Sequence, residues 1–240
     1  MDAFLVALQF LTRIPVSYRY ETGAPLLGRS VLYYPAVGLL LGILLSLPAM
    51  LFAGSSPMLL AAIVLTAWVL LTGGLHLDGL ADCADAWVGG HGDKQRSLQI
   101  MKDPASGPIA VSLLVLVLIL KFAALTAMFE QTRFAPLLIA PVLGRAAILG
   151  LMLTADYVRP QGLAEALLQQ LPRPQTKWVF AICVSIATIF LGFPAVLFAG
   201  GLLFWLRQAA LSHLGGVTGD VYGAAVELTE AAVLMASMLP

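Results

Sequence analysis

Long apolar stretches are the feature of this sequence that most limits how the chain can fold. A helix needs roughly 20 residues to cross a hydrocarbon layer about 30 Å thick. Only 11% of the residues are charged, whereas an average soluble domain has about 25% and needs them on its surface. The sequence therefore predicts an all-α, polytopic membrane protein. Five stretches have the length of a span: Leu32–Phe52, Met58–Leu75, Pro108–Phe129, Phe134–Leu153 and Val221–Leu239.

A further apolar run, Lys177–Leu206, is too long for a single upright helix. Gly192 and Pro194 interrupt it, and both residue types favour a tight turn between two shorter spans. We therefore expect a helical bundle of about seven transmembrane helices. No repeat divides the chain, so residues 1–240 are expected to form one membrane-embedded domain. An amphipathic N-terminal segment should lie along the membrane surface, with one face formed by Phe4, Leu5, Leu8 and Leu11.

Basic residues are distributed unevenly between the two sides of the predicted bundle. Only Arg133 lies on the outer side if the N-terminus is cytoplasmic, which is a clear positive-inside pattern. Lys121 and Arg145 fall inside spans, and we expect Lys121 to extend its amine towards the membrane surface. Thirteen acids balance thirteen bases, so the net charge indicates no nucleic-acid partner. The cytoplasmic bases are Arg13, Arg19, Arg29, Lys94, Arg96, Lys102, Arg159, Arg173, Lys177 and Arg207.

One segment between the second and third predicted spans, residues 73–103, holds a large share of the charge. Asp78, Asp82 and Asp85 are spaced at i, i+4 and i+7, so on a helix they lie within ~60° of one another along ~10 Å. Neighbouring carboxylates repel one another unless a cation holds them together, and Mg²⁺ prefers such hard oxygen ligands. The spacing therefore predicts a magnesium site. The alternative is a solvated loop helix whose acids face water.

Glycines and bases accompany these acids. Glycine pairs at 73–74 and 89–90 allow a ligand to approach the backbone closely. Arg96 and Lys102 can hold phosphate charge opposite the carboxylates. A metal between acids, with bases nearby, is typical of phosphoryl transfer, which depends on positioning and charge neutralisation. His76 is a candidate base or metal ligand, although a single histidine at a helix end is more often structural.

A second polar set surrounds the start of the last predicted span. Thr218 and Asp220 come just before it, on the same side as the first segment, and either can cap the helix. Glu227 lies about two turns inside the span and Glu230 lies deeper, where ionisable residues are usually functional. Buried acids need partners. Arg145 is the expected partner, either for one of these acids or for a substrate phosphate.

The residues 73–85 read Gly-Gly-Leu-His-Leu-Asp-Gly-Leu-Ala-Asp-Cys-Ala-Asp. Together with shorter motifs at 8–15, 34–42, 100–103, 144–145, 216–220 and 223–227, this segment resembles the cobalamin synthase (CobS) family of corrinoid biosynthesis. The resemblance runs over nearly the whole chain. Two departures stand out: Ala86 replaces a glycine, and Pro104–Pro108 differs from the common form of that loop. Both concern local loop shape more than the acidic residues.

The resemblance implies an integral transferase of the bacterial inner membrane, with its active site facing the cytoplasm, that acts late in cobalamin biosynthesis. It would join adenosylcobinamide-GDP to α-ribazole or its 5′-phosphate, release GMP and require Mg²⁺ held by Asp78, Asp82 and Asp85. One of these aspartates, or Asp103, would help to deprotonate the attacking hydroxyl. We also consider a homo-oligomer, or a complex with other corrinoid-pathway enzymes. Expected contacts to the substrate or its phosphates are His76, Arg96, Lys102, Arg145, Thr218, Asp220 and Glu227.

Two other classes of protein share parts of this pattern. CDP-alcohol phosphotransferases also use several aspartates on a membrane helix, but Asp82 follows Ala81 where their motif has arginine, and Ser97 occupies the position of their last acid. A cation-coupled transporter would also bury acids among broken helices. Such a transporter would usually show paired interruptions in two related halves, whereas this chain concentrates its acids in one segment.

Overall fold

The computed structural model describes residues 2–16, 25–52, 54–159 and 163–239. Within these ranges the chain forms twelve α-helices and one 3-10 helix, with no β-strand. The predicted all-α fold is confirmed. The elements are α1 (Asp2–Leu11), α2 (Pro25–Ser30), η1 (Val31–Tyr33), α3 (Tyr34–Leu51), α4 (Pro57–Thr72), α5 (Leu75–Gly89), α6 (Lys94–Ile100), α7 (Pro108–Glu130), α8 (Ala135–Thr154), α9 (Leu163–Gln169), α10 (Arg173–Leu191), α11 (Phe193–His213) and α12 (Gly219–Ala236).

Several of these helices have the length and composition of membrane spans. Among the described residues there are five such segments, namely Pro25–Leu51 and the helices α7, α8, α10 and α11. The helices α4 and α5 pass the same test together and would form a sixth span, bent by 86°. The helix α12 has 18 residues, but it contains three acids and most of its side chains are buried against protein. The chain is therefore polytopic, and the number of seven spans stays a prediction.

The bend between α4 and α5 falls at Gly73 and Gly74. Their φ angles are 64° and 70°, a backbone conformation that residues with a side chain rarely adopt. A Cβ atom on Gly73 would also overlap the side chain of Arg13. The span that the sequence predicts to continue to Leu75 therefore ends at Thr72, and the chain turns into α5.

The turn predicted inside the long apolar run is confirmed. The helix α10 ends at Leu191 and α11 begins at Phe193, so only Gly192 connects two helices that each qualify as a span. The φ angle of Gly192 is 86°, which explains why glycine is needed there. Pro194 occupies the first turn of α11, where its missing amide proton costs no helical hydrogen bond.

The N-terminal segment forms the predicted helix, and its position along a membrane surface stays a prediction. Leu8, Leu11 and Ala7 are buried within the protein, whereas Phe4 and Leu5 are only partly buried. The reason is that α1 packs against α2 and α3. Protein therefore covers the side of the helix that carries Ala3, Val6, Ala7, Leu8 and Leu11.

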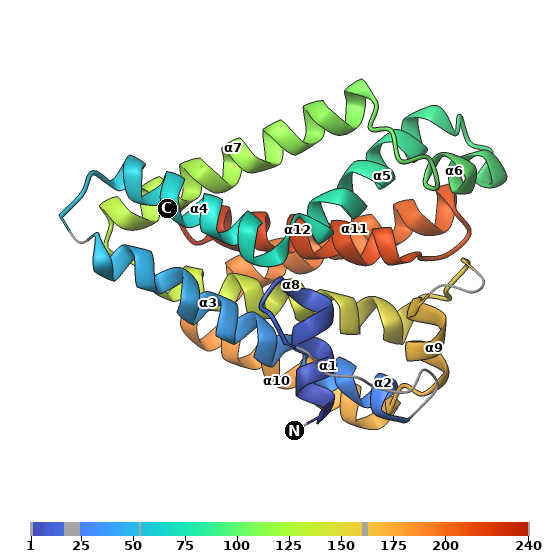
Figure 1. Cartoon of the computed structure of the whole chain (residues 1–240), viewed down its shortest axis with the longest axis horizontal. Coiled ribbons are helices and arrows are strands. Elements are labelled where there is room, and N and C mark those ends of the chain that lie inside the picture. The colour runs from blue at the N-terminus through green and yellow to red at the C-terminus, as the bar shows by residue number, and fades with distance from the viewer. Residues whose placement is uncertain (1, 17–24, 53, 160–162, 240) are drawn as a thin grey trace.

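Glycines four residues apart allow α3 to lie directly against α8. A Cβ atom on Gly38 would overlap the carbonyl group of Pro141, and one on Gly42 would lie 2.9 Å from the Cα atom of Leu138. Small residues at this spacing are typical of close helix packing in membranes. The helix α8 in turn packs against α12, which lies in the middle of the bundle between α5, α7, α8 and α11 (Figure 1).

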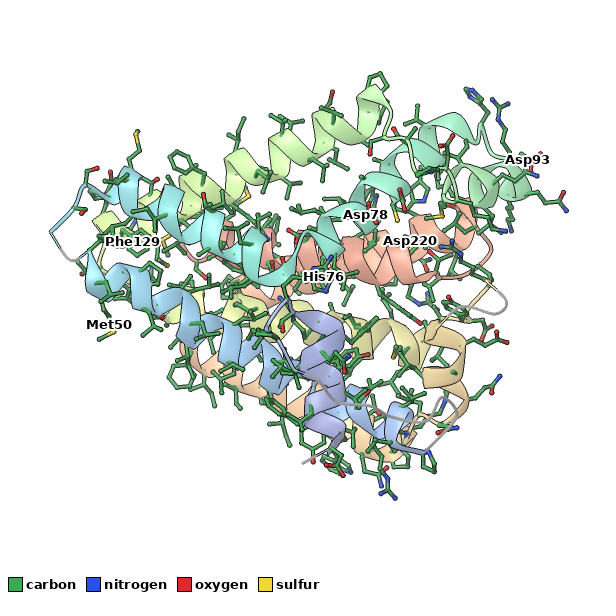
Figure 2. All side chains as sticks on the ribbon, viewed as in Figure 1. Met50, His76, Asp78, Asp93, Phe129 and Asp220 are labelled. Atoms are coloured by element: carbon green, nitrogen blue, oxygen red, sulfur yellow. The ribbon has the colours of Figure 1, made fainter. Side chains whose placement is uncertain are left out.

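The two ends of the bundle differ in charge. Figure 2 shows Met50 and Phe129 at one end and Asp93 at the other. Arg133 follows α7 at the first end, whereas α6 with its basic residues begins just after Asp93 at the second. This separation agrees with the uneven distribution of bases in the sequence. Arg19, one of the ten bases assigned to the cytoplasm, lies outside the described residues.

A network of four charged side chains is buried around α12. The Nζ atom of Lys121 on α7 donates hydrogen bonds of 2.6 Å to Oε2 of both Glu227 and Glu230. Arg145 on α8 donates to Glu230 from its other side, so Arg145 has the acidic partner expected for it. The expectation for Lys121 is wrong, because two carboxylates neutralise its ammonium inside the bundle. The amine also lies 4.7 Å from the ring centroid of Trp68, a favourable cation–π distance.

Replacing Lys121 by methionine should destabilise the protein by about 3–5 kcal/mol, because two buried carboxylates would lose their ammonium partner. The matched control is Lys177→Met, which removes an exposed ammonium. Thermal unfolding of both variants in detergent measures the difference. Equal unfolding midpoints for the two variants would contradict the structural role of the network.

Candidate active site

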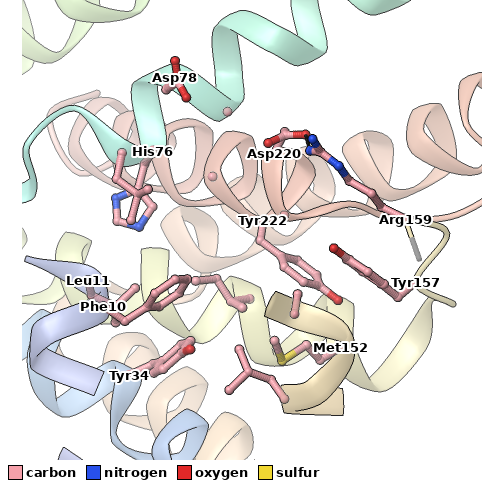
Figure 3. A pocket seen from close by; sticks show the side chains of 17 residues that line it. Phe10, Leu11, Tyr34, His76, Asp78, Met152, Tyr157, Arg159, Asp220 and Tyr222 are labelled. Carbon is pink, nitrogen blue, oxygen red and sulfur yellow. Dashed lines mark hydrogen bonds and ion pairs between the residues drawn. The ribbon is translucent and has the colours of Figure 1, made fainter. Parts of the chain in front are cut away.

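A cavity of about 380 Å³ lies where α1, α3, α5, α8, α9 and α12 meet. Asp78, Asp220 and Arg159 line one part of it, and aromatic side chains line another (Figure 3). Figure 2 places His76, Asp78 and Asp220 between the two ends of the bundle. The acidic segment that the sequence predicts beyond the second span thus continues inside the bundle, beside the last helix.

Two glycines bring the acidic helices α5 and α12 together. A Cβ atom on Gly79 would lie 2.7 Å from the carbonyl oxygen of Asp220, and one on Gly223 would lie 3.1 Å from a carbonyl oxygen of α5. No side chain separates the two backbones at these points. Asp78, the neighbour of Gly79, and Asp220 consequently line the same cavity.

Four carboxylates of this region, those of Asp78, Asp82, Asp85 and Asp220, act on one another electrostatically. Asp82 is half-buried and experiences the negative charges of Asp220 and Asp78 and the positive charge of Arg159. No three His, Cys, Asp or Glu side chains in the described part of the chain form a group that could hold a metal ion by themselves. Magnesium, however, is usually held by one or two carboxylates together with substrate phosphates and water. The donor chemistry of these side chains fits such an ion.

Asp85, the third aspartate of the predicted magnesium site, contacts the backbone of another helix. Its carboxylate accepts hydrogen bonds from the amides of Gly107 and Ala110, the second at 3.0 Å. These amides belong to the N-terminus of α7, where a negative charge is stabilising. The structure therefore brings Asp78 to the cavity and uses Asp85 to position α7.

Arg159 is a site residue that the sequence marks only as a cytoplasmic base. Its Nη1 atom lies 3.0 Å from Oδ2 of Asp220. A single β-bridge between Tyr157 and Val217, with backbone hydrogen bonds of 3.0 and 2.8 Å, ties the two loops together and so places Arg159 beside Asp220. Burial raises the pKa of the Asp220 carboxyl, and the nearby guanidinium opposes part of this shift. No local motif reveals this contact, since it joins segments about 60 residues apart.

The remaining polar candidates around the cavity have different surroundings. Thr218 caps α12, because its hydroxyl oxygen accepts a hydrogen bond of 3.3 Å from the backbone amide of Val221. Lys102 lines a small hollow of about 50 Å³ together with Arg159 and Thr218. Arg96 and Asp103 are exposed and line neither hollow. Lys102 therefore lies beside Arg159 but does not itself line the cavity.

Of the remaining predicted site residues, His76 lines the cavity, whereas Arg145 and Glu227 do not. Arg145 and Glu227 belong to the buried network beneath it, so neither lines the space that a substrate would enter. His76 lines the cavity and is only 3% exposed. Neither of its ring nitrogens has a hydrogen-bond partner among the described residues. This is not the environment of a histidine that holds the fold together through hydrogen bonds.

These features define a polytopic helical membrane protein with a cavity inside its bundle that is lined in part by acidic residues. The family model described as cobalamin-5-phosphate synthase matches residues 3–238, and the chain belongs to this family. The resemblance seen in the sequence is thereby confirmed.

Similar proteins support the same membership. Proteins named adenosylcobinamide-GDP ribazoletransferase from Pseudomonas putida (strain GB-1) and Pseudomonas fluorescens (strain Pf-5) are each 55% identical to this chain, over 235 and 240 residues. In both pairs the match covers 98% of each chain. A protein of the same name from Stutzerimonas stutzeri is 52% identical over 98% of this chain and 97% of its own. No solved structure matches the chain.

The substitution Asp85→Asn should lower the stability of the protein by about 1 kcal/mol, because a neutral amide oxygen interacts less favourably with the N-terminus of α7. Asp82→Asn is the matched control, since it removes a repelled carboxylate that accepts no backbone amide among the described residues. Thermal unfolding in detergent compares the two variants. The positioning role would be disproved by an unfolding midpoint for Asp85→Asn at or above that of Asp82→Asn.

Proposed function

We propose that the protein is an adenosylcobinamide-GDP ribazoletransferase. It joins adenosylcobinamide-GDP to α-ribazole or its 5′-phosphate, giving adenosylcobalamin or its 5′-phosphate and releasing GMP. The main support is the cavity beside α5 and α12, where Asp78 and Gly79 of the 73–85 segment meet Asp220 and Arg159. Proteins that carry this name are 52 to 55% identical over nearly the whole chain. Membership of this family does not favour a CDP-alcohol phosphotransferase or a transporter.

The reaction replaces one phosphorus–oxygen bond by another. A ribazole oxygen attacks the phosphorus on the corrinoid side of the diphosphate, and the bond from that phosphorus to the bridging oxygen breaks. GMP leaves with that oxygen and the bonding electrons. The attacking oxygen belongs to a ribazole hydroxyl, whose proton passes to a carboxylate of the cavity. Asp78 and Asp220 line the cavity, whereas Asp103 lies outside it.

Asp78, Asp82 and Asp220 are the side chains that would hold Mg²⁺. The ion would neutralise the oxygens of the diphosphate, which is the main requirement of phosphoryl transfer. Asp220 takes the place that the sequence assigns to Asp85, because Asp85 is engaged with α7. The carboxylates supply oxygen ligands, and the glycine at position 79 keeps the two helices close enough to share a ligand.

Two bases complete the proposed site. Arg159 and Lys102 line adjoining surfaces, and they place positive charge where negative charge develops on the departing GMP. Arg159 also orients Asp220 through their ion pair. Arg145, in contrast, does not line the cavity and stabilises the bundle through its ion pair with Glu230.

We further propose that the protein lies in the bacterial inner membrane with the cavity open to the cytoplasm. The uneven distribution of bases supports this orientation. The relatives are bacterial. A nucleotide-bearing donor also requires access from water, because its diphosphate cannot enter lipid without a large desolvation cost.

Asp82→Asn should reduce GMP release at least about 100-fold, since the site loses a charge that acts on the reacting phosphate through the metal and the neighbouring acids. The matched control is Glu130→Gln, which removes an exposed carboxylate at the far end of α7 and should leave the rate unchanged. GMP is measured with purified protein, adenosylcobinamide-GDP and α-ribazole. Near-normal turnover by Asp82→Asn would contradict the assignment.

Removing divalent ions should stop GMP release, and added Mg²⁺ should restore it, because the carboxylates alone repel a diphosphate. The measurement compares the initial rate before chelation, after chelation and after Mg²⁺ is returned. A second arm offers CDP-diacylglycerol as donor and should yield no CMP. Full activity after thorough chelation would rule out the metal, and CMP formation would rule out the proposed donor.

A further inference from the structure

The cavity has an aromatic part that the proposed phosphate chemistry does not use. The rings of Tyr157 and Tyr222 are stacked, with centroids 6.4 Å apart and planes inclined by 21°. Phe10 and Tyr34 form a second stacked pair, at 6.1 Å and 27°. All four residues line the cavity, and Figure 3 shows their rings on the side away from Asp78. Faces and edges of aromatic rings favour a flat ligand.

Two residues that line the cavity carry buried polar groups with no partner in the described part of the chain. The hydroxyl of Tyr222, a residue 5% exposed, makes no hydrogen bond there. The same holds for Nδ1 and Nε2 of His76, which is 3% exposed. Buried polar atoms are nearly always hydrogen-bonded, because leaving them unpaired destabilises the protein. Their common position on one cavity points to a ligand that supplies the missing partners.

We propose that the aromatic part of the cavity binds the acceptor nucleoside, an inference that rests on the proposed function. The flat, fused-ring base of α-ribazole lies against the stacked rings, and polar atoms of the nucleoside bond to His76 and Tyr222. Its ribose then extends towards Asp78 and Asp220, where the attacking oxygen meets the donor. His76 and Tyr222 are thus residues that determine acceptor specificity.

The size of the cavity supports the acceptor over the donor. A volume of about 380 Å³ lies near the lower end of the range of roughly 300–1,000 Å³ found for small-molecule sites. This space suits a nucleoside and excludes a corrinoid macrocycle. The donor would therefore reach the site with only its diphosphate, from the side of Asp78, Arg159 and Lys102.

The substitution Tyr222→Phe tests this inference most sharply, because it removes a single buried oxygen that has no partner within the described protein. Without ligand, the unfolding midpoint should stay the same or rise. Binding of α-ribazole should weaken by about three- to tenfold, which corresponds to the loss of one hydrogen bond. A residue with a purely structural role would show the opposite pattern, a lower midpoint with unchanged binding.

His76→Gln provides a second, independent variant and should also weaken nucleoside binding. Two control variants lie outside the cavity. Tyr33→Phe alters a tyrosine that is 40% exposed and packs edge-on against Phe4. His213→Gln alters a histidine that stacks on Trp87. Neither control should change the affinity for α-ribazole.

The measurement uses the purified full-length protein in detergent. Calorimetry gives the affinity for α-ribazole without donor, and GMP release gives KM for each substrate. We expect KM for α-ribazole to rise in both cavity variants while KM for adenosylcobinamide-GDP stays constant. Unchanged α-ribazole affinity in Tyr222→Phe and His76→Gln would overturn the inference, even if the wild type releases GMP. If the wild type released no GMP, the proposed function would fail, and the binding data without donor would still decide this inference.

Discussion

The direct contact between α5 and α12 determines where the charged groups of the site lie. Because Gly79 has no side chain, the backbones of the two helices lie in direct contact at this point. As a result, Asp78 and Asp220 line the same cavity. The left-handed glycines at 73 and 74 are a precondition, because they turn α5 away from α4 and into contact with α12. A side chain at position 79 would separate the helices and disperse the acids.

The two charged sets along α12 differ in their charge balance. The buried network is neutral, since Lys121 and Arg145 match Glu227 and Glu230. The charges of this set balance, although Nε and Nη2 of Arg145 have no hydrogen-bond partner among the described residues. The network fixes α12 relative to α7 and α8, and so it supports the site above it.

The site itself carries excess negative charge. Asp78, Asp82 and Asp220 face a single paired cation, Arg159, in the described part of the chain. Carboxylates in such surroundings favour a bound cation, and a divalent ion in turn favours phosphate oxygens. The imbalance is thus the physical reason to associate this cavity with a metal and a diphosphate, whereas the neutral network below it has no comparable requirement.

The sequence predicts those features that depend on neighbouring residues. The turn at Gly192 follows from residue types within a short segment, and the acidic stripe of α5 follows from helical spacing. The sequence does not show that Asp85 bonds to α7 or that Lys121 is neutralised by α12, because these contacts join residues 25 and 106 positions apart. Arg159 belongs to the same class, since a backbone bridge to a distant loop brings it to Asp220.

The most direct test of the metal-and-diphosphate site is an experimental structure of the protein with adenosylcobinamide-GDP and Mn²⁺ in place of Mg²⁺, because Mn²⁺ can be located by its anomalous signal. The account predicts one or more ions in contact with the carboxylates of Asp78, Asp82 or Asp220 and with the diphosphate. A bound donor whose diphosphate lies elsewhere, with those three carboxylates directed away from it, would contradict the account.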